Sequence, residues 1–237
     1  MKLTRRDALL TTGAALALPA LAHAETESGD DGIGAVEDIL NVGWSTLAPD
    51  PREEIEFEDP VYMNELVETD DESAIVIKFS DGSKLTVGEN AKIVIDKYVY
   101  NPGGSGGEQV ITLSKGAFRF LSGAIPKEKV KISTPTVTIG IRGTELVLDV
   151  ADDGETEMST VAGEADCTDG GGETLTVRVD ESILVGPNRR FRGKVRRFRH
   201  VSRSLAIASG LDGARARWRI RKECRRRRVI RRRRRRN

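Results

Sequence analysis

Short runs of alternating apolar and polar residues follow one another from about residue 54 to residue 185. Successive side chains of a strand point to opposite faces, so this alternation predicts strands that bury one face in a core. Turn-forming segments separate the runs, among them SDGS at 80–83 and NPGGSGGE at 101–108. The apolar members are Ile75, Ile77 and Phe79; Leu85 and Val87; Ile93 and Ile95; Tyr98 and Tyr100; Ile111 and Leu113; Phe118 and Phe120; Val130 and Ile132; and the stretches 175–179 and 183–185.

The stretch STPTVTIGIRGTELVLDV at 133–150 has the clearest alternation, and its parity changes in the middle. The apolar positions are odd before the change and even after it: Val137, Ile139 and Ile141, then Leu146, Leu148 and Val150. If both sets face one core, the chain must shift by one residue between them. Gly143 can allow this shift, since glycine adopts backbone angles that other residues avoid. We therefore expect a structural corner here, in which Arg142 is satisfied locally or by solvent; the alternative is an arginine that recognises a ligand.

Many short strands with regularly spaced turns predict an all-β domain. A sandwich, a barrel and a short solenoid all fit the pattern of the strands alone. The change of parity favours a short β-solenoid or roll-like stack, because such a fold needs corners of this kind. A compact β-sandwich is the alternative.

Three segments resemble the FecR-domain family, whose members are exported all-β modules named for the ferric-citrate regulator. They are FSDGSKLTVG at 79–88, KGAFRF at 115–120 and TPTVTIGIRGT at 134–144, with a weaker match at Gly163. The resemblance covers about residues 55–186. The last segment contains the signature residues, which we expect to be structural: Thr134, Pro135, Arg142, Gly143 and Thr144.

The resemblance implies a periplasmic regulatory or binding module and not an enzyme. Full regulators of this family are anti-sigma proteins with a cytoplasmic helical part and a membrane span. This chain begins instead with an export signal, so it resembles a stand-alone exported version whose envelope partner or ligand is unknown. Control of a sigma factor is therefore not carried over.

Residues 1–24 have the features of a cleavable export signal, with a charged start, an apolar stretch and the small residues Ala22 and Ala24 around the cleavage site. Thr4-Arg5-Arg6 resembles a twin-arginine signal, and an ordinary secretory signal is the alternative. We expect a periplasmic or secreted protein without a further membrane span. Residues 25–54 are acidic and predict a mostly disordered lead-in, with a short helix about residues 35–40.

Charge divides the rest of the chain into two segments. Residues 25–188 carry 12 Lys and Arg against 34 Asp and Glu, whereas residues 189–237 carry 23 against 2. The near-neutral total therefore hides net charges of −22 and +21. We place the boundary at about residues 186–188, with an Arg-rich, low-complexity tail over 187–237 that we expect to be disordered.

The tail has two interpretations. Such a basic segment can bind polyanions through their phosphates, without sequence-specific recognition of nucleic acid. The residues that would make such contacts are Arg225, Arg226, Arg227, Arg228, Arg231 and Arg232. However, the tail has 21 Arg and 2 Lys, whereas residues 25–188 have 4 Arg and 8 Lys. This contrast also fits a shifted reading frame in a GC-rich gene, where repeated GAC codons read as CGA.

The residues available for chemistry argue against catalysis, a metal site or a cofactor. His23 lies in the signal and His200 in the tail, so the β domain lacks the commonest general base. Cys167 and Cys224 lie on either side of the charge boundary and form no zinc motif. The acidic clusters at 70–72 and 152–155 fall in predicted turns, where solvated carboxylates are the simpler interpretation. We thus expect a non-catalytic regulatory, sensing or scaffolding module, with polyanion binding by the tail as the alternative and a carboxylate-based enzyme less favoured.

Overall fold

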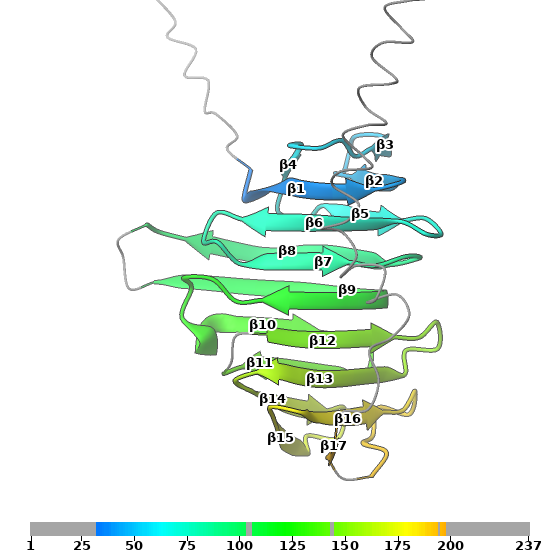
Figure 1. Cartoon of the computed structure of the whole chain (residues 1–237), viewed down its shortest axis with the longest axis vertical. Coiled ribbons are helices and arrows are strands. Elements are labelled where there is room, and N and C mark those ends of the chain that lie inside the picture. Colours follow the sequence, from blue (N-terminus) through cyan, green and yellow to red (C-terminus); the bar gives the residue numbers. More distant parts are fainter. Residues whose placement is uncertain (1–31, 103–105, 143–144, 194, 198–237) are drawn as a thin grey trace, which may run out of the picture. The chain divides into compact units, whose positions relative to one another are not determined.

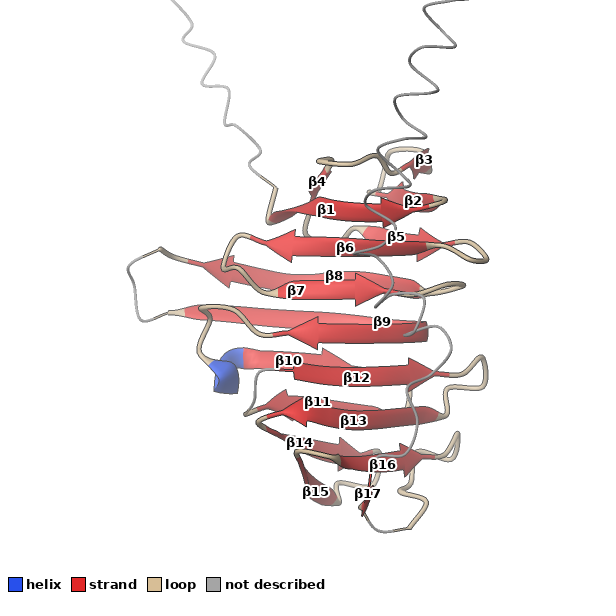
Figure 2. Cartoon of the chain, in the orientation of Figure 1, coloured by secondary structure: helices blue, strands red, loops and turns tan. Residues whose placement is uncertain are grey.

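The computed structural model describes residues 32–102, 106–142, 145–193 and 195–197, and these residues form strands in two facing sheets (Figures 1 and 2). The first sheet, sheet A, has the order β4 (Pro60–Val61), β1 (Gly34–Leu40), β6 (Ala74–Phe79), β7 (Lys84–Val87), β9 (Gly107–Leu121), β12 (Glu145–Val150), β13 (Thr156–Ala162), β16 (Glu181–Val185) and β17 (Arg196–Arg197). Sheet B has the order β3 (Glu53–Glu54), β2 (Gly43–Thr46), β5 (Leu66–Thr69), β8 (Lys92–Tyr100), β9, β10 (Val130–Ser133), β11 (Val137–Ile141), β14 (Glu164–Asp169) and β15 (Thr174–Arg178). A short 3-10 helix, η1 (Lys127–Lys129), precedes β10.

The chain builds both sheets together, from one end of the stack to the other (Figure 1). Strands lie in each sheet in nearly their chain order, because the chain passes repeatedly between the two sheets. The long strand β9 belongs to both: its first part pairs with β8 in sheet B and its last six residues pair with β12 in sheet A. This arrangement confirms the predicted all-β, roll-like stack. Neighbouring named strands run antiparallel except β9 and β10, so the stack is not built from parallel solenoid coils.

The core fills the space between the sheets. Most of the apolar positions identified by alternation point inward and are buried, including three phenylalanines at 0–1% exposure: Phe79, Phe118 and Phe120. Tyr100 is only partly buried, and Val179 is 48% exposed. Burying a phenylalanine side chain contributes about 1.5–3 kcal/mol to folding.

The change of parity within 133–150 has a simple structural cause. Strand β11 lies in sheet B and β12 lies in the facing sheet A, so the chain changes sheets between Ile141 and Glu145. Residues that face the core from opposite sheets can have opposite parity. All six apolar residues of the two strands are buried at 0–3% exposure: Val137, Ile139, Ile141, Leu146, Leu148 and Val150. The expectation of one shared core is thus confirmed, while Gly143 and Thr144 lie outside the described residues.

The fold begins earlier than the sequence suggested. Residues 34–54 are not a disordered lead-in with a helix, because they form β1, β2 and β3. Val36 and Ile39 have helix-like spacing, yet a register shift in β1 lies between Val36 and Asp38 and brings both apolar side chains to the core. A β-bulge inserts one extra residue into a strand, which allows two residues three positions apart to face the same side.

The fold also continues past the expected boundary at residue 186. Phe191 forms a bridge to Val185 and packs against the core, and β17 pairs with β16. The first residues of the Arg-rich segment therefore belong to the stack. The export signal, Cys224 and the six arginines between 225 and 232 lie outside the described residues.

Candidate functional site

A cavity of about 290 Å³ lies at the end of the stack where the chain enters it. Its walls come from the first strands of both sheets and the connections between them. The apolar floor consists of core residues: Val36, Ile55, Val61, Val67 and Ile77. Leu47, Pro51, Pro60 and Tyr62 add further apolar surface, and Ser45 adds a hydroxyl.

Five carboxylates line the same cavity: Asp50, Glu53, Glu54, Asp59 and Glu65. Among the described residues, no lysine, arginine or histidine shares this lining. Arg52 is close in sequence, but its guanidinium lies 4.4 Å from the centre of the Trp44 ring and its Nε lies 3.5 Å from Glu68 Oε2. Trp44 and Ser45 are successive residues of β2 and point to opposite sides of the strand, so Arg52 is directed away from the cavity.

Glu65 is the most buried of these carboxylates, with 3% of its surface exposed. Its Oε2 accepts a hydrogen bond from the Tyr62 amide at 2.6 Å, and its Oε1 accepts one from the Ser45 hydroxyl. Burial raises the pKa of Glu65, and the nearby charge of Asp59 acts in the same direction, while the two hydrogen bonds oppose them. The carboxylate therefore lies in a position where an added positive charge would be stabilised.

The segment at 79–88 forms a hairpin turn around a buried aspartate. Both Ser83 N and Ser83 Oγ donate to Asp81 Oδ1, and Ile125 N donates to Oδ2 at 3.2 Å. The Tyr98 hydroxyl donates to Oδ1 at 3.2 Å and accepts from the Asp81 amide at 2.7 Å. Phe79 stacks on the Tyr98 ring with centroids 5.5 Å apart. Burial raises the pKa of Tyr98, so the phenol stays protonated and can act as this donor.

The segment at 115–120 contains the point where β9 passes from one sheet to the other. Gly116 has φ +106°, and a Cβ there would lie 2.6 Å from the Cα of Ala91. Glycine is needed both for the backbone angle and for the close approach of the two strands.

The segment at 134–137 ties the turn after β10 to the turn before β13. Thr134 Oγ1 accepts from the Val137 amide at 3.1 Å and lies 3.0 Å from Thr156 Oγ1. The buried Thr136 hydroxyl donates to Gly154 O at 2.9 Å. Pro135 lies against Gly154, where an added Cβ would be 3.1 Å from the proline Cβ. These contacts join sheet B to sheet A where the strands end in turns.

Residues 65–166 match the family described as FecR protein. This match confirms the FecR resemblance for residues 65–166.

Structural comparison finds two crystal structures of a candidate anti-sigma factor from Parabacteroides distasonis ATCC 8503, solved at 2.50 Å and 1.65 Å. Each is 11% identical to this chain, with a TM-score of 0.45. The likeness covers 60% of this chain and 62% of that chain. The sequence matches no protein with a curated description.

The described residues of the FecR signature do not lie together at one site. Thr134 and Pro135 precede β11, whereas Arg142 follows it, so they lie at opposite ends of that strand. Arg142 Nε lies 2.6 Å from Asp166 Oδ2, and the arginine side chain is 62% exposed. The Arg142 amide also donates to Glu164 O. These contacts support the expected local role of Arg142.

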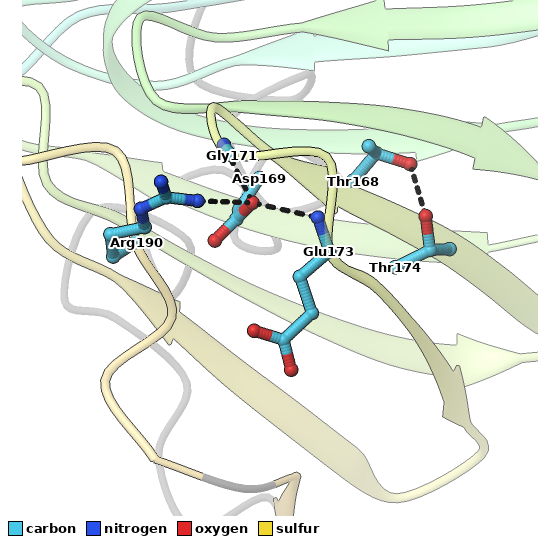
Figure 3. A network of polar contacts seen from close by, with 6 residues as sticks. All are labelled: Thr168, Asp169, Gly171, Glu173, Thr174 and Arg190. Carbon is cyan, nitrogen blue, oxygen red and sulfur yellow. Dashed lines mark hydrogen bonds and ion pairs between the residues drawn. The ribbon is translucent and has the colours of Figure 1, made fainter.

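Sequence reasoning missed a second buried aspartate, at the turn between β14 and β15. Asp169 Oδ1 accepts from the amides of Gly171 and Glu173 at 2.8 Å and 3.0 Å, and Arg190 Nη1 lies 3.5 Å from it (Figure 3). Burial opposes ionisation, yet the amides of Gly171, Glu173 and Phe191, together with Arg190, hold the pKa of Asp169 below its usual value. The available signal was the Asp-Gly pair, which Asp169 shares with Asp81.

The other candidate groups named from the sequence do not line the cavity. Cys167 is buried, and burial raises the pKa of its thiol. Asp70, Asp71, Asp152 and Asp153 are exposed in or beside turns, as expected. Across the described ranges, no three His, Cys, Asp or Glu side chains are grouped so that they could hold a metal ion. Within the same part of the chain, no helix has the length and hydrophobicity that a membrane crossing requires.

Proposed function

We propose that this protein is an exported, non-catalytic regulatory or sensing module that acts by binding a partner or ligand in the cell envelope. The match of residues 65–166 to the FecR family carries the proposal, because the family resemblance implies regulation through binding. The export signal read from residues 1–24 supports an envelope location.

The chemistry of the FecR segments supports binding over catalysis. Asp81, Thr134 and Thr136 use their polar atoms to hold turns and to join the sheets. Cys167 is buried, so it is not placed to act as a nucleophile. The cavity, by contrast, offers accessible apolar side chains and carboxylates, which are features of a binding site.

Export is tested by fusing residues 1–60 to a reporter that is active only in the periplasm. We expect activity from the parent fusion. A matched variant with Arg5→Lys and Arg6→Lys keeps the positive charge but removes the arginine pair, so loss of export in this variant identifies the twin-arginine route. Retention of the parent fusion in the cytoplasm would contradict the proposed location.

Partner binding is tested by crosslinking the full mature chain, residues 25–237, in the envelope of the producing cell. Complexes are then washed over a range of salt concentrations. Contacts between the arginines and a polyanion weaken steeply as salt rises, whereas binding through the fold should persist. Recovery of a salt-resistant protein partner supports the regulatory proposal. Recovery of polyanions alone, lost at high salt, would favour the alternative function of the tail.

A further inference from the structure

We infer that the cavity at the entry end of the stack binds a small organic cation, in which an ammonium or guanidinium group is attached to a short hydrocarbon part. The inference deepens the proposed sensing function and rests on it. The cavity is built mainly by residues 36–65, most of which precede the family match at 65–166. Most of the site therefore lies before the FecR match, while Glu65, Val67 and Ile77 lie within it.

The size of the cavity sets the size of the ligand. Small-molecule sites commonly have volumes of about 300–1,000 Å³, so 290 Å³ is at the lower limit. A dry apolar cavity of about 150 Å³ can already hold a benzene-sized molecule. The space therefore fits a chain of several carbon atoms with one charged group.

The accessible apolar wall of the cavity favours the hydrocarbon part. Leu47 and Tyr62 are half-buried and Pro51 and Pro60 are exposed, and these four side chains cover the buried core residues beneath them. Water in contact with this surface has few polar partners, and its displacement by methylene groups is favourable by about 0.8 kcal/mol for each buried group.

The carboxylates select the charged part. Five acidic side chains share the lining, and Arg52 is engaged elsewhere by Trp44 and Glu68. An anion would meet only like charges here, whereas a cation would neutralise part of the repulsion between Glu65 and Asp59. The cavity is therefore complementary to a positive charge.

Glu65 is the anchor expected for the cation. A carboxylate has about four sites that accept hydrogen bonds, and Ser45 and Tyr62 use two of those on Glu65. A bound ammonium or guanidinium can use the remaining acceptor sites. Charge-assisted bonds of this kind are roughly twice as strong as neutral ones, and partial burial protects them from screening.

The test uses the full mature chain, residues 25–237, and n-hexylammonium as the probe in isothermal titration calorimetry. We expect a Kd below about 1 mM, given that very small ligands can bind efficiently for each atom. Hexanoate and 1-hexanol have the same chain with a negative or neutral head group. Each should bind at least about 10-fold more weakly, which corresponds to a difference of about 1.4 kcal/mol.

Variants locate the site. Glu65→Gln keeps an amide oxygen for Tyr62 but removes the charge, and should weaken hexylammonium binding about 10-fold. The double change Glu53→Gln and Glu54→Gln removes two negative charges from exposed residues at the rim of the cavity. The negative potential that attracts the cation becomes smaller, so binding should weaken about 3-fold. Glu128→Gln, on the exposed η1 far along the chain, is the matched control and should bind within about 2-fold of the parent.

Amide chemical shifts give a second measurement. Hexylammonium should shift the resonances of Ser45, Glu65 and Val67, which line the cavity. Equal binding of all three hexyl compounds would overturn the inference, as would full affinity in both the Glu65 and the rim variants. If Glu65→Gln fails to fold, the rim variant still decides the question. Failure of these tests would leave the salt-resistant envelope partner unaffected, so the two proposals can fail separately.

Discussion

Asp81 lies at the centre of a hydrogen-bond network that is the most informative target for mutation. Its carboxylate accepts four hydrogen bonds, from Ser83 N, Ser83 Oγ, Tyr98 Oη and Ile125 N. Ser83 is 0% exposed and Ile125 is 2% exposed, so water cannot readily replace the lost acceptor. Asp81→Ala would leave these donors without their partner.

The magnitude follows from the two backbone amides. A hydroxyl can rotate toward another acceptor, but the amides of Ser83 and Ile125 are fixed by the chain. Each buried donor left unsatisfied costs about 1–3 kcal/mol, so Asp81→Ala should lower the free energy of unfolding by about 2–6 kcal/mol. Asp81→Asn keeps one acceptor oxygen but turns an NH₂ group toward a donor, and should cost about 1.5–3 kcal/mol.

Asp153 provides the matched control. Its Oδ1 accepts from Glu155 N at 3.0 Å, which repeats the local bond from Ser83 N to Asp81, but this turn is exposed. Solvent can replace the lost bond, so Asp153→Ala should change stability by about 0.5 kcal/mol or less.

Urea unfolding of the mature chain, followed by circular dichroism, measures all three variants. A lower midpoint with an unchanged slope reports a loss of stability rather than a different unfolded state. If Asp81→Ala and Asp153→Ala unfold at the same urea concentration, burial of the Asp81 network does not govern its contribution and the reasoning is refuted.

Three further predictions follow from the same stack. Arg142→Ala should cost no more than about 1 kcal/mol in urea unfolding, since its ion pair is largely exposed; a larger loss would mean that the corner is shielded. Gly116→Val should cost about 3 kcal/mol or more, because positive φ and contact with Ala91 both oppose it, whereas Gly82→Ala has positive φ but open space and should cost about 1–2 kcal/mol; equal costs would show that the contact is unimportant. The lowered pKa of Asp169 contributes stability above the unfolded value of about 3.9 that is lost as pH falls through the folded pKa, so Asp169→Asn should be less stable at neutral pH and lose less stability on acidification; an unchanged pH profile would contradict this.

The sequence determined the class of the fold because alternation and turn residues are local properties. Residues Val137 to Val150 are an example. The change from odd to even apolar positions predicted a corner, and the chain passes there from sheet B to sheet A. Asp81 and Gly116 meet local needs in part, through the turn bond from Ser83 and through the positive φ of Gly116, whereas their contacts with Ile125 and Ala91 are tertiary.

Tertiary structure decided the ends of the fold and the candidate site. The spacing of Val36 and Ile39 does not indicate a strand, because a bulge in β1 separates them. Only the pairing of β1 with β6 shows that both residues belong to a strand. The cavity brings Ser45 beside Glu65, and the pair of Asp169 with Arg190 joins a turn to the start of the basic segment. Such contacts depend on how separate strands pack against one another, and no local pattern of residues records that packing.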